Sequence, residues 1–102
     1  MRKTEERMLN ALRENKSVSL ANTYVSVNGE EKAVYLHSNK IALFTCGKLY
    51  VSLCGWNTTT TRSRLRALGV NITTKQGTPY IGGKSVSSYG VYEIDRYTGN
   101  LA

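Results

Sequence analysis

The sequence is poor in the residues that enzymes and metal proteins commonly use. It has one histidine, His37, at the end of an expected strand, and no pattern that pairs a general base with a nucleophile. Glu93 and Asp95 share one face of an expected strand, but two carboxylates without further ligands are typical of a solvated strand edge. We therefore expect a protein that is not an enzyme, with no catalytic residue, no metal and no cofactor.

Cysteines are also few, and long apolar runs are missing. Cys46 and Cys54 are expected several residue pairs apart, on different faces, so that no disulfide closes between them. No second cysteine pair is present to complete a zinc site. No apolar run has the length of a signal peptide or a membrane span. We therefore expect a cytoplasmic protein without a membrane partner.

Acidic residues are missing from the middle of the chain. The whole sequence has 14 Lys and Arg residues against 7 Asp and Glu residues, a formal net charge of +7, but residues 32–92 contain no acid at all. The basic residues of that stretch are Lys32, Lys40, Lys48, Arg62, Arg64, Arg66, Lys75 and Lys84. A surface built from them favours a polyanion or an acidic protein as partner, although a basic protein can also carry its charge simply to stay soluble.

The hydrophobic periodicity predicts one small α+β domain. Residues 4–15 carry an apolar stripe at helical spacing, whereas from residue 17 the apolar residues alternate with polar ones. The strands expected from this alternation cover residues 23–27, 33–37, 41–45 and 49–53. We assign an N-terminal helix to residues 1–16, a four-stranded antiparallel meander to 17–56, a short second helix to 57–69, a C-terminal β-hairpin to 70–95 and a loose tail to 96–102.

Turn chemistry and side-chain packing predict the registers of the meander. A type II′ turn at 47–48 places Phe44 opposite Val51. At the first turn, packing favours a four-residue loop over 28–31, which places Val25 opposite Val34. Both faces of the resulting sheet are apolar, so we expect one helix on each face.

Three stretches resemble a family of small uncharacterised proteins of tailed bacteriophages. They are L-H-S-N-K-I-A at 36–42, L-C-G-W-N-T-T-T-T at 53–61 and R-L-R-A-L-G at 64–69. Members of the family are similar in L-H-x-N-x-I-A, glycine-aromatic-x-T-x-T-T and R-L-x-A-L patterns, followed by a strand that ends in an aromatic residue. The resemblance covers about residues 33–81. It implies a viral protein in the host cytoplasm, and it implies no activity.

The stretch 56–69 is the strongest candidate for a binding site. A helix over about residues 60–68 turns Leu65 toward the core, projects Arg62 and Arg66 away from it, and places Arg64 beside the apolar stripe. Free amides at a helix start, together with threonine hydroxyls and arginines, suit a phosphate group.

Aromatic residues near this helix can stack on a base, as in proteins that bind single strands; Trp56 and Tyr80 are the candidates. The alternative is ordinary helix anatomy, with a threonine cap, a buried Trp56 and solvated arginines. The residues that we predict to bind nucleic acid or another partner are Arg62, Arg64, Arg66, Thr58, Thr59, Thr60, Lys48, Lys75, Lys84 and Tyr80.

Two functions of different classes follow from these observations. The first is a small, basic, non-enzymatic protein of a phage that binds DNA or RNA through the threonine and arginine helix. The alternative is a phage effector that binds an acidic host protein and inhibits or redirects a host enzyme of nucleic-acid handling or defence. Pro79 on an edge strand, together with the tyrosines near it, leaves room for a homodimer.

Overall fold

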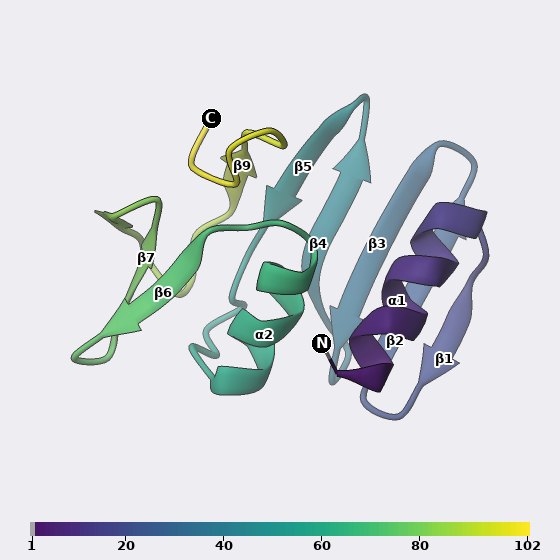
Figure 1. Cartoon of the computed structure of the whole chain (residues 1–102), viewed down its shortest axis with the longest axis horizontal. Helices are drawn as coiled ribbons and strands as arrows, with labels where there is room; N and C mark the ends of the chain where they lie inside the picture. Colours follow the sequence, from purple (N-terminus) through teal and green to yellow (C-terminus); the bar gives the residue numbers. More distant parts are fainter. Residues whose placement is uncertain (1) are drawn as a thin grey trace.

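Two helices and nine strands make up the computed structural model, which describes residues 2–102 (Figure 1). The elements in chain order are α1 (Lys3–Glu14), β1 (Val18–Leu20), β2 (Thr23–Asn28), β3 (Glu31–Leu36), β4 (Asn39–Thr45), β5 (Lys48–Val51), α2 (Thr59–Ala67), β6 (Ile72–Lys75), β7 (Thr78–Ile81), β8 (Lys84–Ser85) and β9 (Tyr92–Ile94). Within this range neither helix is long and apolar enough to span a membrane. The α+β class predicted from the sequence is confirmed.

The strands form two antiparallel sheets. The larger has the order β1-β2-β3-β4-β5-β9, so the predicted meander, β2 to β5, gains one strand at each edge. The predicted pairing of Val25 with Val34 is confirmed, but the loop is shorter than predicted because Asn28 already pairs with Glu31. The smaller sheet has the order β6-β7-β8 and extends the predicted C-terminal hairpin. The strand that carries Pro79, β7, is therefore central in this sheet, and its prediction as an edge strand was wrong.

The hairpin of β4 and β5 differs from its prediction. Its loop is Cys46-Gly47, with φ of 52° and 74°, and Phe44 pairs with Leu49. The predicted turn at 47–48 and the pairing of Phe44 with Val51 were therefore wrong. Two consecutive positive φ values are the geometry of a type I′ turn, and the backbone twist of this turn matches the twist of the two strands it joins.

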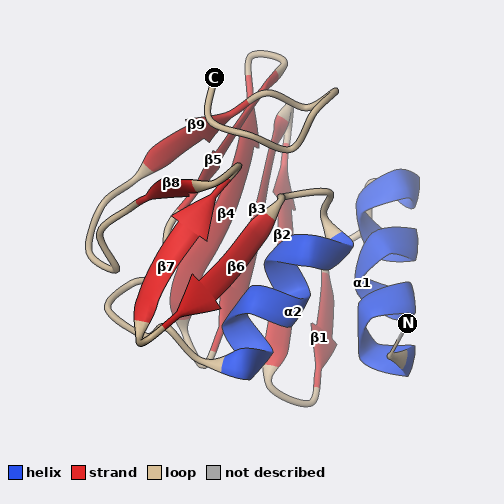
Figure 2. Ribbon diagram, turned by 60° about the vertical axis from the view of Figure 1, so that its left-hand side comes forward, coloured by secondary structure: helices blue, strands red, loops and turns tan. Residues whose placement is uncertain are grey.

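Both helices cover the same face of the large sheet, as Figure 2 shows, and they contact each other. The prediction of one helix on each face was wrong because of a bulge in β4. Val34 pairs with Ala42, but the next residue of β3 pairs with Lys40, so Ile41 is the extra residue and both Ile41 and Ala42 are buried. The alternation of β4 is thereby reversed, and only one sheet face is fully apolar. The other face carries Tyr24, Tyr35, Leu43 and Tyr50.

A buried ion pair joins the two helices. The Nη1 of Arg64 lies 2.8 Å from the carboxylate of Glu5, and both side chains are about 5% exposed. The hydroxyl of Ser63 donates to the same carboxylate oxygen. Arg64 also donates from Nε to the Thr23 hydroxyl and from Nη2 to the Asn22 side chain, at 3.1 and 3.2 Å. The network therefore ties α1, α2 and the start of β2 together.

Two opposing effects act on the pKa of Glu5. Burial by itself raises the pKa of Glu5, but the hydrogen bonds from Ser63 and Arg64 and the positive charge of Arg64 outweigh burial. The pKa of Glu5 therefore lies below its ordinary value, and the carboxylate is charged at neutral pH. A folded-state pKa below the unfolded one stabilises the fold above the unfolded pKa, and this stability is lost as the pH falls through the folded pKa.

The C-terminal segment is docked, although a loose tail was predicted for 96–102. Leu101 bridges to Ile94, and the amide of Ala102 donates to the carbonyl of Glu93 at 3.0 Å. The amide of Asn71 donates to the carbonyl of Gly99 at 2.8 Å. The segment thus closes onto β9 and onto the chain before β6.

Replacing Glu5 tests the buried ion pair. We expect Glu5→Gln to lower the free energy of unfolding at neutral pH by about 3 kcal/mol, because it leaves the buried Arg64 without an opposite charge. As the pH falls below the ordinary glutamate pKa, the wild type loses the stability that the ion pair contributes. Its free energy of unfolding therefore decreases more steeply on acidification than that of Glu5→Gln. Urea unfolding across this pH range measures both effects. Glu6→Gln, an exposed neighbour in the same helix, should change stability by less than about 0.5 kcal/mol; equal effects of the two variants would contradict the account.

Replacing Gly99 tests the docking of the C-terminal segment. Gly99 has a φ of 79°, and an added Cβ would meet the carbonyl oxygen of Gly69 and the amide of Asn71. Gly29 has a φ of 63°, but a Cβ there would meet nothing within 4 Å. We expect Gly29→Ala to cost about 1 kcal/mol of stability from backbone strain alone, and Gly99→Ala about 3 kcal/mol because overpacking adds to that strain. Thermal and urea unfolding measure the difference; a Gly99→Ala cost no larger than that of Gly29→Ala would show that the segment is not docked.

Candidate nucleic-acid interface

The threonine run forms the start of α2. Thr58 has an extended backbone, and its hydroxyl accepts from the amide of Thr61 at 3.1 Å, which is the geometry of an N-cap. The hydroxyls of Thr58 and Thr61 also share a hydrogen bond of 2.8 Å. Of the predicted threonines, Thr59 is exposed and Thr60 is half-buried. Thr58 therefore serves the helix itself, while the next two hydroxyls face outward to different degrees.

The three predicted arginines have three different environments. Arg64 is 4% exposed and is bound to Glu5, so its prediction as a partner-binding residue was wrong. The physical reason is that a buried guanidinium needs a buried carboxylate, and the first turn of α1 supplies one. Arg62 is half-buried, and Arg66 is exposed. Arg66 donates from Nε to the carbonyl of Ile72 at 2.8 Å, which fixes its stem beside β6.

Asn57 fastens the start of α2 to the smaller sheet. Its side-chain amide donates to the Thr74 hydroxyl at 3.1 Å and to the Gly77 carbonyl at 3.3 Å. Its backbone and side-chain oxygens both accept from Nη1 of Arg62. Arg62 is thereby held against the residue that precedes the helix, and its Nε is buried without a partner among residues 2–102. Sequence reasoning missed Asn57, because an asparagine before a threonine run looks like part of the turn.

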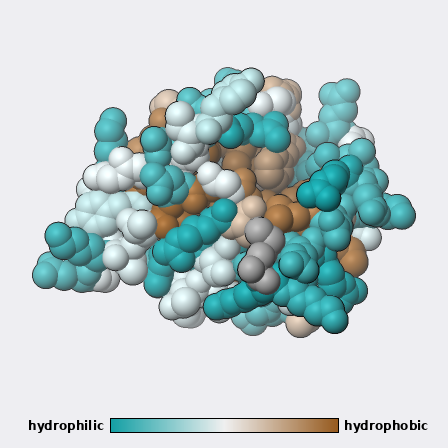
Figure 3. Space-filling model, viewed as in Figure 1, coloured by the Kyte–Doolittle hydropathy of each residue, from teal (hydrophilic) through white to brown (hydrophobic). Residues whose placement is uncertain are grey.

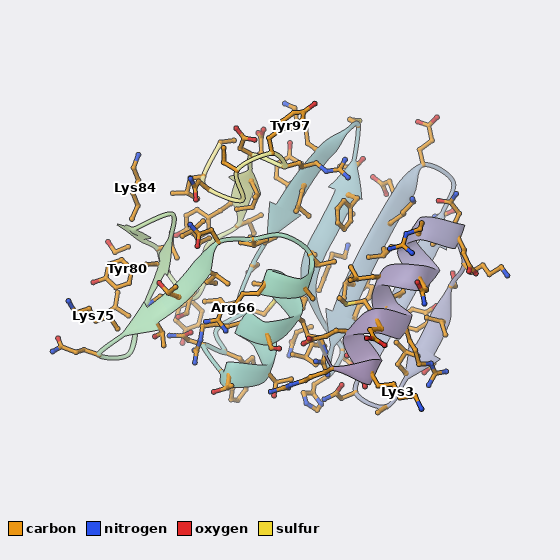
Figure 4. All side chains as sticks on the ribbon, in the orientation of Figure 1. Lys3, Arg66, Lys75, Tyr80, Lys84 and Tyr97 are labelled. Atoms are coloured by element: carbon orange, nitrogen blue, oxygen red, sulfur yellow. The ribbon has the colours of Figure 1, made fainter. Side chains whose placement is uncertain are left out.

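Four of the predicted residues gather around the smaller sheet: Arg66, Lys75, Tyr80 and Lys84 (Figure 4). We call this set the basic ridge. Tyr80 pairs with Thr73, so Tyr80 and Lys75 lie on the same outer face of the sheet, two positions apart. Both lysines are exposed, and Tyr80 is half-buried. In Figure 3 the tip of the β6–β7 hairpin is hydrophilic.

Lys48 does not belong to this ridge. It lies at the end of the β4–β5 turn, where its Nζ is 3.9 Å from the carboxylate of Glu93. Both side chains are exposed by more than a third, so this pair contributes little to stability. The predicted site therefore divides into the ridge, the start of α2 and an isolated Lys48.

Of the residues considered for catalysis, Glu93 and Asp95 have separate partners, and His37 lies in a turn that contains neither of them. His37 is exposed in the β3–β4 turn, Glu93 faces Lys48, and the carboxylate of Asp95 accepts from the amides of Tyr97 and Thr98. Within residues 2–102 no group of three or more His, Cys, Asp or Glu side chains is placed to hold a metal ion.

Trp56 is on the surface. It is 62% exposed, so the interpretation in which it packs into the core was wrong. Leu53 and Leu65 are buried at this end of the sheet instead, at 4% and 0% exposure. A large aromatic residue is thus left in contact with solvent directly before the threonine run.

The comparison with known proteins gives a family. The family model described as the Kyanoviridae Gp96 protein matches residues 1–98. The match extends beyond residues 33–81, where the resemblance was recognised, and includes α1 and all of β9. No curated protein and no solved structure matches the chain. The chain belongs to the Kyanoviridae Gp96 protein family, a family of small tailed-phage proteins.

Proposed function

We propose that this phage protein is a non-enzymatic nucleic-acid-binding protein that contacts the phosphate backbone through the basic ridge. The observation that carries the proposal is the presence of Arg66, Lys75 and Lys84 on or beside one small sheet, in a stretch of chain that contains no acid, although Lys84 pairs with Ile81 and so lies on the opposite face from Lys75. Clustered cations without interspersed acids attract polyanions and raise the rate of encounter with them.

The cations of the ridge have no acidic partner in the part of the chain that the structure describes. Within residues 2–102 no carboxylate pairs with Arg66, Lys75 or Lys84. Because Nε of Arg66 is already bound to a backbone carbonyl, the terminal nitrogens of its guanidinium are held in a defined direction. A guanidinium held in this way suits the two oxygens of a phosphate group.

The start of α2 extends this contact surface. Asn57 binds the β6–β7 hairpin next to Lys75, and the same residue holds Arg62. Arg62 in turn reaches the Thr59 hydroxyl at 3.5 Å. A nucleic-acid backbone bound along the ridge would continue toward Arg62 and the Thr59 hydroxyl.

A second candidate function is the effector that binds a host protein. The observation that favours it is the outer face of the large sheet, which no helix covers and which carries Tyr24, at 44% exposure, together with Tyr35 and Tyr50. Tyrosine is enriched in protein interfaces. Capture of a host protein that persists after nuclease treatment and is abolished by Tyr24→Ser supports this function over the first.

A salt titration of DNA and RNA binding tests the proposed function. We expect the affinity to fall steeply with salt, and the double variant Lys75→Gln/Lys84→Gln to lower the slope of log affinity against log salt by about 2, since two phosphate contacts are lost. Fluorescence anisotropy of labelled oligonucleotides measures both. The matched control, Lys3→Gln/Lys16→Gln, removes the same charge from exposed positions in and after α1 and should leave the slope unchanged. Absence of binding at low salt, or equal effects of the two double variants, would refute the proposal.

A further inference from the structure

A pocket of about 450 Å³ opens beside the start of α2. Its walls are apolar, from Leu36 and Ile41 of the β3–β4 hairpin and from Leu53 after β5. These three side chains are less than 5% exposed, so they form a fixed wall rather than a flexible one. The volume is in the range of pockets that bind small molecules.

Polar side chains surround this apolar wall. His37, Asn39 and Thr60 line the pocket, and within residues 2–102 none of these three side chains has a hydrogen-bond partner. Thr58 and Thr61 also border it, but their hydroxyls are occupied in the helix cap. An apolar pocket with a few unoccupied donors and acceptors at its edge is typical of a binding site.

Trp56 stands at the edge of the pocket on a fixed backbone. Its amide donates to the carbonyl of Leu53 at 2.8 Å, and its carbonyl accepts from the amide of Thr58 at 2.9 Å. Its side chain is nevertheless 62% exposed. The indole is thus presented from a rigid support, with one apolar pocket beside it and solvent elsewhere.

The turn that carries His37 is strained. His37 and Ser38 both have positive φ, 49° and 67°, although neither is the glycine or asparagine that a type I′ turn prefers. Strained backbone of this kind persists at functional sites, where it aims a side chain. The turn places His37 at the edge of the pocket.

We propose that this pocket holds one unstacked base of a single-stranded nucleic acid, with Trp56 stacked on the base. The inference rests on the proposed function, because the phosphates on either side of that base need the cations of the basic ridge and Arg62. Asn57, the neighbour of Trp56, binds both Arg62 and the hairpin that bears Lys75, so one residue connects the chain at the pocket edge to these cation-bearing elements.

The chemistry of the pocket fits a nucleic-acid base. A base has an apolar face for the indole and the leucine wall, and polar edges for the side chains of Asn39 and His37. A base within a duplex is paired and stacked on both sides and is not free to enter. The pocket therefore favours single strands over duplexes of the same sequence.

Trp56 reports on its own occupancy because it is the single tryptophan of the chain. We expect its fluorescence to be quenched when single-stranded DNA or RNA oligonucleotides are added at low salt, and to change little with a duplex of the same sequence. We expect Trp56→Ala to weaken single-strand binding about 10-fold, the effect of one lost stacking contact. Its binding to duplex, and the salt slope, should stay unchanged.

Two further variants keep the test decisive. Trp56→Phe retains an aromatic ring and should recover most of the single-strand affinity, which a merely structural role would not predict if Trp56→Ala folds normally by circular dichroism. Tyr97→Ala removes an aromatic residue that is fully exposed, at 101% exposure, and should change neither affinity.

The outcomes separate the pocket from the proposed function. Salt-dependent binding with no quenching, or with equal affinity of Trp56→Ala and wild type for single strands, overturns the pocket and leaves the proposed function standing. Absence of binding to any oligonucleotide overturns both. Quenching by single strands, with a selective loss in Trp56→Ala, supports the pocket.

Discussion

The ion pair between Glu5 and Arg64 is the contact on which the arrangement of the helices depends. It links residues 59 positions apart, and a charge buried to this extent is tolerable only when its partner is in place. Because Arg64 also binds the start of β2, the pair draws α1 and α2 onto one face of the large sheet. One consequence is that the opposite face stays uncovered, with its tyrosines exposed to different degrees.

The start of α2 is held by Asn57. Arg64 fixes the middle of α2 to α1 and the large sheet, while Asn57 fixes the residue before the Thr58 cap to the β6–β7 hairpin. A helix start held from two sides moves little relative to either sheet. Trp56 directly precedes Asn57, so its backbone is held in a fixed position, as the backbone of a binding residue needs to be. The structural role of the helix and the proposed role of its start do not compete, because different residues carry them.

Local patterns predicted the elements, but contacts between distant residues decided how the elements meet. Alternation and packing were enough to find the pairing of Val25 with Val34, because one register places apolar residues opposite each other on the buried face of this hairpin. The bulge at Ile41 could not be found in this way, because an extra residue in a strand leaves no mark on the apolar pattern. Glu5 was equally hidden, because an acid in the first turn of a helix also suits the helix dipole. Trp56 is at the surface because of the turn that the chain makes after β5, and the sequence pattern does not predict the direction of that turn.

The free charge of the basic ridge is a consequence of topology. The acidic residues lie at or before Glu31 and at or after Glu93, and the described ion pairs take Lys16, Lys48 and Arg64. These cations lie near α1, at the β4–β5 turn and inside the core. The small sheet is built entirely from the acid-free stretch, so no carboxylate of its own neutralises its lysines. The chain thus separates its charges by folding its acid-bearing ends onto the large sheet and leaving the acid-free hairpin to project from it.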